Sequence, residues 1–574
     1  MASNSSGGAA EGGGYDCIVV GGGAAGCALA SRLSERSGVS VLLIEAGRDT
    51  PPGAEPADVL DVYPSSYYNK ANMWSEQKVH WRRRDNSPAV AMDQGRIMGG
   101  GSSVMGMVAL RGIPDDYDEW ERMGADGWGW SGVLPYFKRL ENDFNFDGDA
   151  HGKSGPVPIR RIPRETWSPL AKATFDYGEA RQMPFVADMN ADFRDGYCAL
   201  PMSNWPDKRA SSAIAYLTAD VRARANLTVM SNAHVVGLTF EGDRVTGVEV
   251  ETEGGRRRFA ARETILSMGA LRSPIMLMRA GIGPAAHLGE HGIAVRRDVA
   301  AVGTNLSNHP VLFIGMHLRK PFRHPDSLRT LQISCLRYSS GIPGCPPTDM
   351  IINIQGKSSW NKLGAQIANF GPVLWKPFSR GQVSLRSADP FEQPLVECNF
   401  LDDERDLKRM VDGFRRAVDL LASPEVSKLG GRPFPVSYTD RLRRMNQLTK
   451  ANAYRTAAIA RLLDVAPGLS DRMLSALTSG IADIKALAND EPRLADHVLR
   501  NVAGTFHVAG TAKMGTADDR SAVVDPQGRV YGVGGLRVAD ASIMPIVPRA
   551  NTNIPSIMVG EKIADAVLAD AAAG

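Results

Sequence analysis

The sequence predicts an α/β protein that joins a Rossmann-type dinucleotide-binding domain to an α+β domain built on an antiparallel sheet. A β run, a glycine-rich turn and a helical pattern follow one another at residues 15–37, as in a βαβ unit. Residues 311–400 favour β strands, whereas residues 403–500 are mostly helical. With 574 residues the chain is too long for one ordinary core, so two large domains are expected.

The remaining elements are predicted from local periodicity. The N-terminal unit contains a buried parallel strand at 15–20, a helix at 27–37 and a second strand at 39–44. Two β runs at 228–250 are broken at 241–243, which indicates a hairpin. Further strands are expected at 311–318, 351–354 and 381–385, and helices at 273–279 and 554–571.

Composition is that of a globular protein and excludes several classes. The chain is 43% hydrophobic and 22% charged, and 66 basic and 63 acidic residues give a net charge of +3. This balance gives no electrostatic footprint for nucleic acid, so we expect no nucleic-acid partner. Because no charge-free apolar stretch is long enough to cross a bilayer, we expect no membrane partner either.

The six cysteines and the N-terminus indicate a location. The cysteines are scattered and form no CxxC or CxxH pair, which argues against a structural metal site or a disulfide framework and fits a reducing compartment. Residues 1–14 are small and polar and lack the basic and apolar parts of a signal peptide. We interpret them as a disordered tail and expect a cytoplasmic protein.

The segment Gly21-Gly22-Gly23-Ala24-Ala25-Gly26 has the form of a dinucleotide fingerprint. Its first glycine permits the tight turn, its second lets the backbone approach a pyrophosphate, and its third lets the helix pack on the sheet. Glu45 follows about 20 residues later, where a carboxylate can accept hydrogen bonds from ribose hydroxyls. These features predict a dinucleotide site without separating FAD from NAD.

Four further motifs, in order along the chain, resemble those of the glucose-methanol-choline (GMC) oxidoreductase family. They are 95–103 (GRIMGGGSS), 269–283 (GALRSPIMLMRAGIG), 303–309 (GTNLSNH) and a C-terminal block at 507–515 and 536–562. The resemblance extends from residue 15 to about residue 570. It is closest to the branch of aryl-alcohol and 5-hydroxymethylfurfural oxidases.

The resemblance implies a discontinuous FAD-binding domain that consists of residues 15–60, 91–150, 196–310 and 501–574. The substrate-binding domain would contain residues 61–90, 151–195 and 311–500. Within it, residues 451–490 are expected to form a helical insertion. We interpret this insertion as packing on its own domain or forming a subunit contact, and a docking surface for a membrane or an electron acceptor is the alternative.

FAD is the cofactor that the resemblance implies, and Val104 makes noncovalent binding the expectation, since some relatives attach FAD through a histidine at that position. Met105 replaces an asparagine that is usual beside the flavin, which leaves the redox poise open. The expected cofactor-binding residues are Gly21, Gly23, Ala24, Ala25, Gly26, Glu45, Ala46, Arg96, Gly99, Gly100, Ser102, Ser103, Met105, Gly106, Val235, Asp540, Ala541, Asn551, Thr552 and Asn553.

His507 and Asn551 are the expected catalytic pair. Oxidation of an alcohol by a flavin moves a hydride from the carbinol carbon, and this requires a base at the hydroxyl group. Histidine suits that task because its ordinary pKa of about 6.5 lies near the working pH. His507 falls on the family's catalytic position, and Asn551 would orient the substrate oxygen. His309 is expected to fix a loop by hydrogen bonds.

Aromatic side chains are expected to form the substrate wall. Phe506 precedes the base and is the first candidate, and Trp360, Trp375 and Phe378 offer further flat apolar surface for an aromatic or furanic alcohol. Core packing is the alternative for the last three.

The predicted function is oxidation of a primary, aromatic or furanic, alcohol to an aldehyde, with O₂ reoxidising the flavin to give H₂O₂. A dehydrogenase that uses a quinone or another acceptor is the nearest alternative. A hydroxynitrile lyase or a light-driven decarboxylase on the same fold would belong to different classes. The sequence does not name the alcohol or the oligomeric state.

Overall fold

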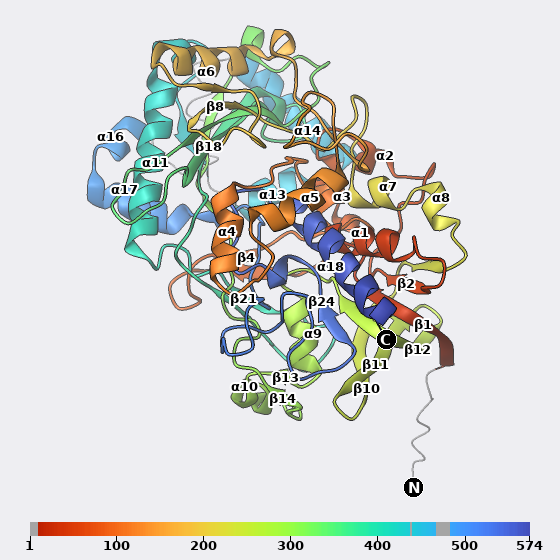
Figure 1. The fold of residues 1–574 in the computed structure, drawn as a ribbon. Coiled ribbons are helices and arrows are strands. Elements are labelled where there is room, and N and C mark those ends of the chain that lie inside the picture. The colour runs from red at the N-terminus through yellow and green to blue at the C-terminus, as the bar shows by residue number, and fades with distance from the viewer. Residues whose placement is uncertain (1–9, 437–438, 466–482, 574) are drawn as a thin grey trace.

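Two large sheets organise the protein, whose computed structural model describes residues 10–436, 439–465 and 483–573 (Figure 1). In Figure 1 the first sheet lies at lower right, and the second lies at upper left beneath α6 and α11. The first has seven strands: β1 (Ala10–Val20), β2 (Val41–Ile44), β9 (Leu227–Met230), β10 (His234–Glu241), β11 (Arg244–Thr252), β12 (Gly255–Leu266) and β24 (Leu536–Val538). The second has nine: β7 (Phe185–Val186), β8 (Gly196–Ala199), β15 (Pro310–Val311), β16 (Ile314–His317), β17 (Gln332–Tyr338), β18 (Met350–Gln355), β19 (Ile367–Leu374), β22 (Phe434–Pro435) and β23 (Ala503–Gly504).

Smaller sheets and the helices complete the described structure. The smaller sheets contain β3 (Lys78–His80), β4 (Ala89–Ala91), β20 (Gln382–Ser384) and β21 (Leu395–Glu397), the pair β5 (Glu141–Asp143) and β6 (Val157–Ile159), and the pair β13 (Ile282–Gly283) and β14 (Arg297–Asp298). The helices are α1 (Ala24–Leu33), α2 (Ala57–Leu60), α3 (Gly101–Val104), α4 (Pro114–Arg122), α5 (Trp130–Leu140), α6 (Pro169–Ala180), α7 (Ser212–Tyr216), α8 (Ala219–Arg222), α9 (Ser273–Arg279), α10 (Ala285–Glu290), α11 (Glu404–Ala422), α12 (Pro424–Ser427), α13 (Asp440–Met445), α14 (Lys450–Val465), α16 (Ile484–Ala488), α17 (Glu491–Asn501) and α18 (Asn553–Ala573).

The seven-stranded sheet confirms the predicted Rossmann-type half. Strands β12, β1, β2 and β9 pair in parallel, and β10 and β11 add an antiparallel hairpin at one edge. Strand β2 is fully buried and apolar, and β1 and β12 are buried at their C-terminal ends (residues 17–20 and 264–266), as parallel strands covered on both faces require. Helix α1 packs against the C-terminal helix α18, so the two ends of the chain meet over this sheet.

The predicted start of the first strand and the predicted ends of the first helix were wrong. Strand β1 begins at Ala10 instead of residue 15, because Ala10 and Glu11 extend the pairing with Arg257 and Arg258 of β12. The expected disordered tail at 1–14 is therefore too long, and residues 1–9 lie outside the described structure. Helix α1 begins at Ala24 directly after the glycine turn and ends at Leu33, earlier than expected.

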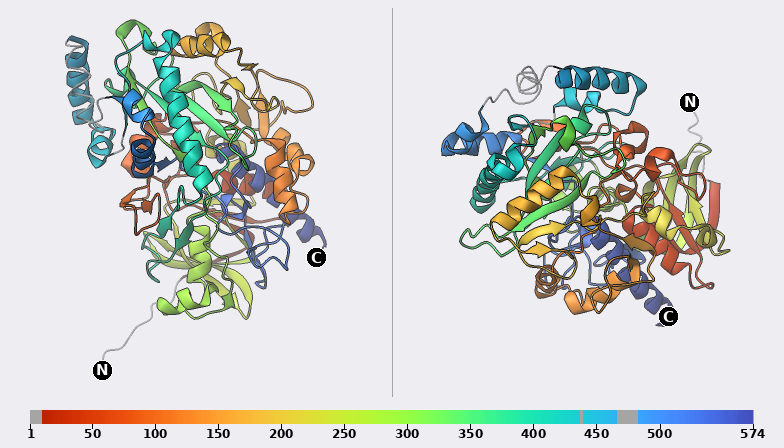
Figure 2. Two further views of the ribbon diagram at one scale, coloured as in Figure 1. Left: turned by 90° about the vertical axis from the view of Figure 1, so that its left-hand side faces the viewer. Right: turned by 90° about the horizontal axis from the view of Figure 1, so that it is seen from above.

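The nine-stranded sheet is largely antiparallel and is the main sheet of the substrate-binding half. Helix α11 lies along one face of it, and its buried residues recur at helical spacing (Figure 2). Gly413 of α11 faces Met350 and Pro372, so these two side chains point toward the helix. Because side chains alternate across a strand, Ile351, Asn353 and Gln355 of β18 point to the opposite face.

Two segments lie outside the domain that the sequence suggested. Gly196–Ala199 (β8) and Ala503–Gly504 (β23) were expected in the FAD-binding domain, but they pair with β17 and β15 of the nine-stranded sheet. Backbone hydrogen bonds thus tie both to the substrate half. We therefore propose that these two strands belong to the substrate-binding domain and that the other domain boundaries hold.

The predicted insertion at 451–490 is helical where it is described, and residues 466–482 lie outside the described structure. Helix α14 buries Ala460 and Leu463, the latter in a small apolar cluster with Leu363 and Phe434. Its outer face leaves Tyr454 and Val465 exposed. Of the described helices, none has both the length and the apolar character that a membrane span requires.

A network of six buried ionisable side chains underlies β5 and β6 and consists of Arg111, Glu141, Asp143, His151, Arg161 and Asp188. Nδ1 of His151 lies 2.9 Å from Oε1 of Glu141, and its Nε2 lies 2.8 Å from Oδ2 of Asp188. With His151 protonated, three cations balance three carboxylates. Burial alone lowers the pKa of His151, but its hydrogen bonds to Asp143 and Asp188 outweigh this effect and raise the pKa.

This network predicts a dependence of stability on pH. The pKa of His151 is raised in the folded protein, so its contribution is fully present below the unfolded pKa of about 6.5 and is lost as pH rises through the folded pKa. We expect His151→Gln to lose about 1–3 kcal/mol at pH 6 and to show a weaker loss of stability between pH 6 and pH 9 than the wild type. Urea unfolding at both pH values measures this, and parallel curves for the two proteins would contradict it.

Candidate active site

A cavity of about 580 Å³ connects the two halves of the molecule. It begins at the β1–α1 turn and the end of β2 and continues to residues of β15, β17 and β18 in the nine-stranded sheet. Its volume falls within the range of about 300–1,000 Å³ that is usual for ligand and cofactor sites. Its position beyond the carboxyl ends of parallel strands is the one at which α/β sheets bind dinucleotides.

The fingerprint glycines divide into two groups. Gly21 has a φ of +103°, and a Cβ there would lie 2.5 Å from the carbonyl oxygen of Ser267. A Cβ on Gly26 would lie 1.9 Å from the carbonyl oxygen of Gly21, so this glycine is required by the packing of α1 on β1. Gly23 lines the cavity, and its Cβ would meet only that Ser267 oxygen, at 3.8 Å. Gly23 therefore leaves its space open for a ligand.

Glu45 faces this end of the cavity from the end of β2. Its two carboxylate oxygens accept hydrogen bonds from the backbone N–H groups of Gly22 at 2.9 Å and Gly47 at 2.8 Å. The side chain is buried, which raises its pKa. These two bonds fix the carboxylate at this end of the cavity, and its contact with a ribose stays a prediction.

The second glycine cluster forms a tight loop beside the fingerprint. Gly100, Ser102, Met105 and Gly106 line the cavity. Gly99, Ser103 and Arg96 were expected there too but do not line it. Gly99 donates from its N–H to the carbonyl of Gly22, and the Ser103 hydroxyl donates to the carbonyl of Met98. The Arg96 guanidinium lies over Trp74 and donates to the carbonyl of Ala46.

Gly26 does not line the cavity either, but all the remaining predicted cofactor residues do. These cavity-lining residues are Gly21, Ala24, Ala25, Ala46, Val235, Asp540, Ala541, Asn551, Thr552 and Asn553. Asp540 is held by hydrogen bonds from the Ser273 hydroxyl and from the backbone N–H groups of Gly269 and Ser542. Buried Oδ1 of Asn553 has no protein partner and faces the site. This orphaned acceptor and the open space at Gly23 both fit a bound dinucleotide.

His507 and Asn551 meet at the centre of the cavity. His507 follows β23 of the substrate half, and Asn551 precedes α18 of the cofactor half. Nε2 of His507 lies 3.0 Å from Nδ2 of Asn551. Phe506 has a φ of +65°, an unusual value for an aromatic residue, and such strain is commonly found next to catalytic groups. The structure brings the predicted pair together.

Two residues that the sequence did not place beside the base contact its second ring nitrogen. Oγ1 of Thr505 donates to the carbonyl of His309 at 3.2 Å and lies 2.8 Å from Nδ1 of His507. Nδ1 of His309 also lies 2.9 Å from Nδ1 of His507. Because the amide nitrogen of Asn551 can only donate, Nε2 of His507 accepts from it, and the ring proton is then on Nδ1. Nε2 is then an unprotonated acceptor facing Asn551.

His309 is thus more than the loop anchor that the sequence predicted, since its ring contacts the catalytic histidine. Burial lowers the pKa of both rings, that of His507 to about 3 and that of His309 well below its ordinary value, with the nearby His507 and Lys376 adding to the effect on His309. His507 is therefore neutral over the whole physiological range. A signal for His309 was present, since it ends the GTNLSNH motif.

The substrate end of the cavity is aromatic, but only one of the predicted residues forms it. Phe506 lines the cavity together with Tyr67, Trp81 and Phe313, and its ring centroid lies 6.3 Å from that of Tyr67 and 6.4 Å from that of Trp81. Tyr67 and Trp81 come from a segment with weak periodicity that gave no signal.

Three predicted wall residues lie elsewhere. Trp360 does not line the cavity and donates from its indole N–H to the carbonyl of Asn446 at 2.7 Å. Trp375 is 3% exposed and packs in the apolar cluster behind Val311. Phe378 stacks against the guanidinium of Arg405. Trp375 therefore packs in the core, which was the alternative expectation, and Trp360 and Phe378 pack against other parts of the protein.

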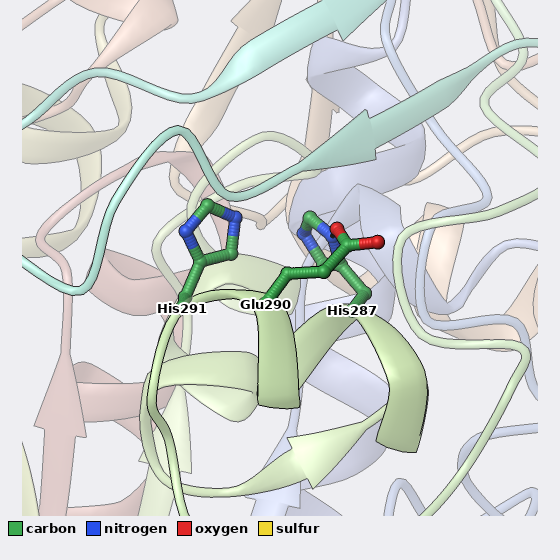
Figure 3. Close-up of side chains that lie close together, drawn as sticks. All are labelled: His287, Glu290 and His291. Atoms are coloured by element: carbon green, nitrogen blue, oxygen red, sulfur yellow. Dashed lines mark hydrogen bonds and ion pairs between the residues drawn. The ribbon is translucent and has the colours of Figure 1, made fainter.

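Helix α10 brings His287, Glu290 and His291 together at the surface (Figure 3). Nε2 of His287 accepts the backbone N–H of Leu385 at 3.0 Å, and its Nδ1 faces a Glu290 oxygen at 3.3 Å. Since a neutral imidazole has one N–H and one lone pair, both nitrogens are already used. We interpret this cluster as an anchor between α10 and the chain after β20, and we assign no metal to it.

A dinucleotide crevice that opens onto a neutral, desolvated histidine defines a nucleotide-dependent oxidoreductase. Family comparisons make this class specific. The N-terminal GMC oxidoreductase model matches residues 15–311 and the C-terminal model matches residues 377–560. The chain belongs to the GMC oxidoreductase family; it is an enzyme that acts on CH–OH groups, and its cofactor is FAD. Val104 is a buried aliphatic residue, so it provides no atom for a covalent link.

Similar proteins extend over nearly the whole chain. The chain is 39% identical over 565 residues to a 5-(hydroxymethyl)furfural oxidase of Methylovorus sp. (strain MP688), covering 95% of this chain and 97% of that protein. It is 33% identical to an oxygen-dependent choline dehydrogenase of Sinorhizobium fredii, covering 95% and 94%. The crystal structure of pyridoxine 4-oxidase from Mesorbium loti matches with a TM-score of 0.79 at 26% identity, covering 96% and 98%.

Replacement by alanine is expected to have different effects at the two kinds of glycine. Gly23→Ala should leave the stability of the apoprotein unchanged but weaken FAD binding at least tenfold, because the new methyl group occupies the open space that the cofactor needs. Gly26→Ala should cost the fold about 1–3 kcal/mol or more, because its methyl group meets the Gly21 carbonyl. Flavin content and thermal unfolding of the apoproteins distinguish these effects, and equal unfolding curves for both variants would refute the assignment.

Proposed function

We propose that this enzyme oxidises a primary alcohol, aromatic or furanic, to the aldehyde, and that O₂ reoxidises the cofactor to give H₂O₂. The observation that carries the proposal is the pairing of a neutral His507 with Asn551 in a cavity lined by dinucleotide-binding residues. Further support comes from the 39% identity to a 5-(hydroxymethyl)furfural oxidase.

The residues divide the chemistry between them. When bound, FAD supplies the hydride acceptor at flavin N5. Unprotonated Nε2 of His507 accepts the proton of the substrate hydroxyl, and the Asn551 amide holds the hydroxyl oxygen by a hydrogen bond. Phe506 and Trp81 provide flat apolar surface for the ring of the substrate. Both catalytic side chains thus act on the same oxygen.

Oxygen as the final acceptor is the part of the proposal that depends most on the relatives. The similar proteins include an oxidase and an oxygen-dependent dehydrogenase. Met105 beside the cavity removes an amide that is usual in the family, and a dehydrogenase using a quinone remains the alternative.

All six cysteines are unpaired, which supports a reducing, cytoplasmic location.

Replacement of the base tests the proposed mechanism. His507→Ala should lower the rate of anaerobic flavin reduction by about 10²–10⁴ while the flavin remains bound, because the variant has no acceptor for the hydroxyl proton. Stopped-flow absorbance at the flavin band measures this step alone. An unchanged rate would remove His507 from the mechanism.

The low pKa of His507 predicts the pH profile. A base acts in its unprotonated form, and a pKa of about 3 keeps His507 unprotonated down to acidic pH. We therefore expect kcat/KM to be flat between about pH 5 and pH 8 and to fall only in more acidic solution. A descending acid limb with a midpoint between pH 6 and pH 7 would contradict this assignment.

A single spectroscopic experiment separates the alternative functions. The holoenzyme is mixed without oxygen with benzylic, furfuryl and aliphatic alcohols, and air is then admitted. Bleaching of the flavin band by an alcohol, followed by rapid recovery in air with peroxide, is the expected result. Recovery only with added quinone would indicate a dehydrogenase. If no alcohol bleaches the flavin, cleavage of a cyanohydrin or light-driven loss of CO₂ from a fatty acid would indicate the lyase or the decarboxylase.

A further inference from the structure

The wall of the cavity contributed by the nine-stranded sheet is polar away from the catalytic pair. Gln332 of β17 and Asn353 and Gln355 of β18 line the cavity. Gln332 and Gln355 are directly opposite each other in the register of the two strands. Side chains paired in this way share a face and lie about 5 Å apart at Cβ. Asn369 of β19 pairs with Gln355 in turn, so amides form a row across three strands.

This row of amides is not satisfied within the protein. Gln332 is 6% exposed and Asn369 is 2% exposed, and the carbonyl oxygen of each amide has no hydrogen-bond partner among the residues that the structure describes. A buried, unpaired amide oxygen costs about 1–3 kcal/mol, so such groups in native proteins commonly face a ligand or an ordered water. The apolar face of the same strands toward α11 contains no such amides, since Met350, Ile352 and Ile354 point there.

The strand register gives the separation of the amides from the row of residues beside the segment that precedes the base. Val311 pairs with Ala503, four residues before His507, and lies in the row of Val373 and Ile351. Asn353 is one row further along β18, about 7 Å away, and the row of Gln355 is two rows away, about 13 Å. One row is comparable to the length of a single substituted aromatic ring. A ring that lies along β18 with its alcohol at His507 and its near edge at the Val311 row would direct its opposite substituent at Asn353, with Gln332 in the adjacent row.

We propose that Asn353 and Gln332 recognise a second hydroxyl group, located across the ring from the alcohol that is oxidised. This inference rests on the proposed alcohol oxidation and adds a substrate class to it: diols in which an aromatic or furanic ring carries two hydroxyl-bearing substituents. A hydroxyl group both donates and accepts, so it pairs with a neutral amide in either orientation. A carboxylate only accepts and would leave the orphaned amide oxygen of Gln332 unpaired.

The test compares two substrates of nearly the same shape. In 4-(hydroxymethyl)benzyl alcohol the second substituent ends in a hydroxyl, and in 4-ethylbenzyl alcohol it ends in a methyl group. We expect the wild type to prefer the first by at least tenfold in kcat/KM, because the second leaves the amides unpaired. Asn353→Leu and Gln332→Met remove the amides at similar volume and should each reduce this ratio about tenfold. Since each variant serves as its own reference, a general loss of activity cancels in the ratio.

Gln382→Met is the matched control, since Gln382 is an exposed glutamine on β20 outside the cavity and its replacement should leave the ratio unchanged. Binding provides a second readout: in the His507→Ala holoenzyme, flavin difference spectra give the dissociation constants of both alcohols without turnover. We expect the dissociation constants to show the same preference for the diol, and we expect this preference to be lost when Asn353→Leu or Gln332→Met is added. Either variant suffices for the test if the other does not fold.

A wild-type ratio near one, or a ratio that neither amide variant changes, overturns the inference even if benzyl alcohol is oxidised rapidly. If no benzylic alcohol bleaches the flavin but the dissociation constants still favour the diol, the amide site stands and the proposed oxidation falls. If the alcohols are neither oxidised nor distinguished in binding, both fail.

Discussion

The short antiparallel pairing of β23 with β15 is the constraint on which the site depends. Ala503 and Gly504 hydrogen-bond to the substrate sheet, and only a few residues later Ala509 and Gly510 bond to segments that precede β15 and follow β24. His507 lies between these two anchors. The base is thus fixed to both halves, and its position does not depend on a flexible loop. Asn551 approaches from the start of α18, so the pair forms only when the two halves are packed together.

Desolvation explains how this arrangement can supply a base. A histidine held by a neutral threonine, a neutral histidine and a neutral amide meets, in the described part of the chain, no carboxylate that would stabilise its protonated form. Burial then lowers its pKa to about 3 and keeps Nε2 unprotonated. The cost is visible nearby: Phe506 is held at positive φ, and buried Nε2 of His309 makes no hydrogen bond of good geometry within the described residues. Strain and unsatisfied groups of this kind persist where the surrounding fold overdetermines them.

Sequence patterns predicted the elements that depend on local order. The βαβ unit, the hairpin after residue 228 and helix α9 follow from short-range periodicity and glycine spacing, and His507 and Asn551 from motif position. Long-range pairing was not predictable in the same way. Nothing in Gly196–Ala199 or Ala503–Gly504 shows which sheet they join, because two- and four-residue strands contain too few residues to display a pattern. Trp360 and Trp375 failed as wall residues for a related reason, since aromatic character does not reveal which way a side chain points.

The same limit explains why the polar wall was missed. In the sequence, Gln332, Asn353 and Gln355 are unremarkable amides in β runs, and only the register of β17, β18 and β19 places them in adjacent rows on one face. Once they are placed, the two ends of the cavity differ: an unprotonated acceptor and an aromatic wall lie at one end, and three amides, among them the unsatisfied Gln332, lie at the other. A site that pairs both ends of a substrate discriminates more strongly than an apolar pocket, because an analogue that lacks one end leaves buried polar groups unpaired. The base therefore determines which bond reacts, and the sheet register determines which molecule can present it.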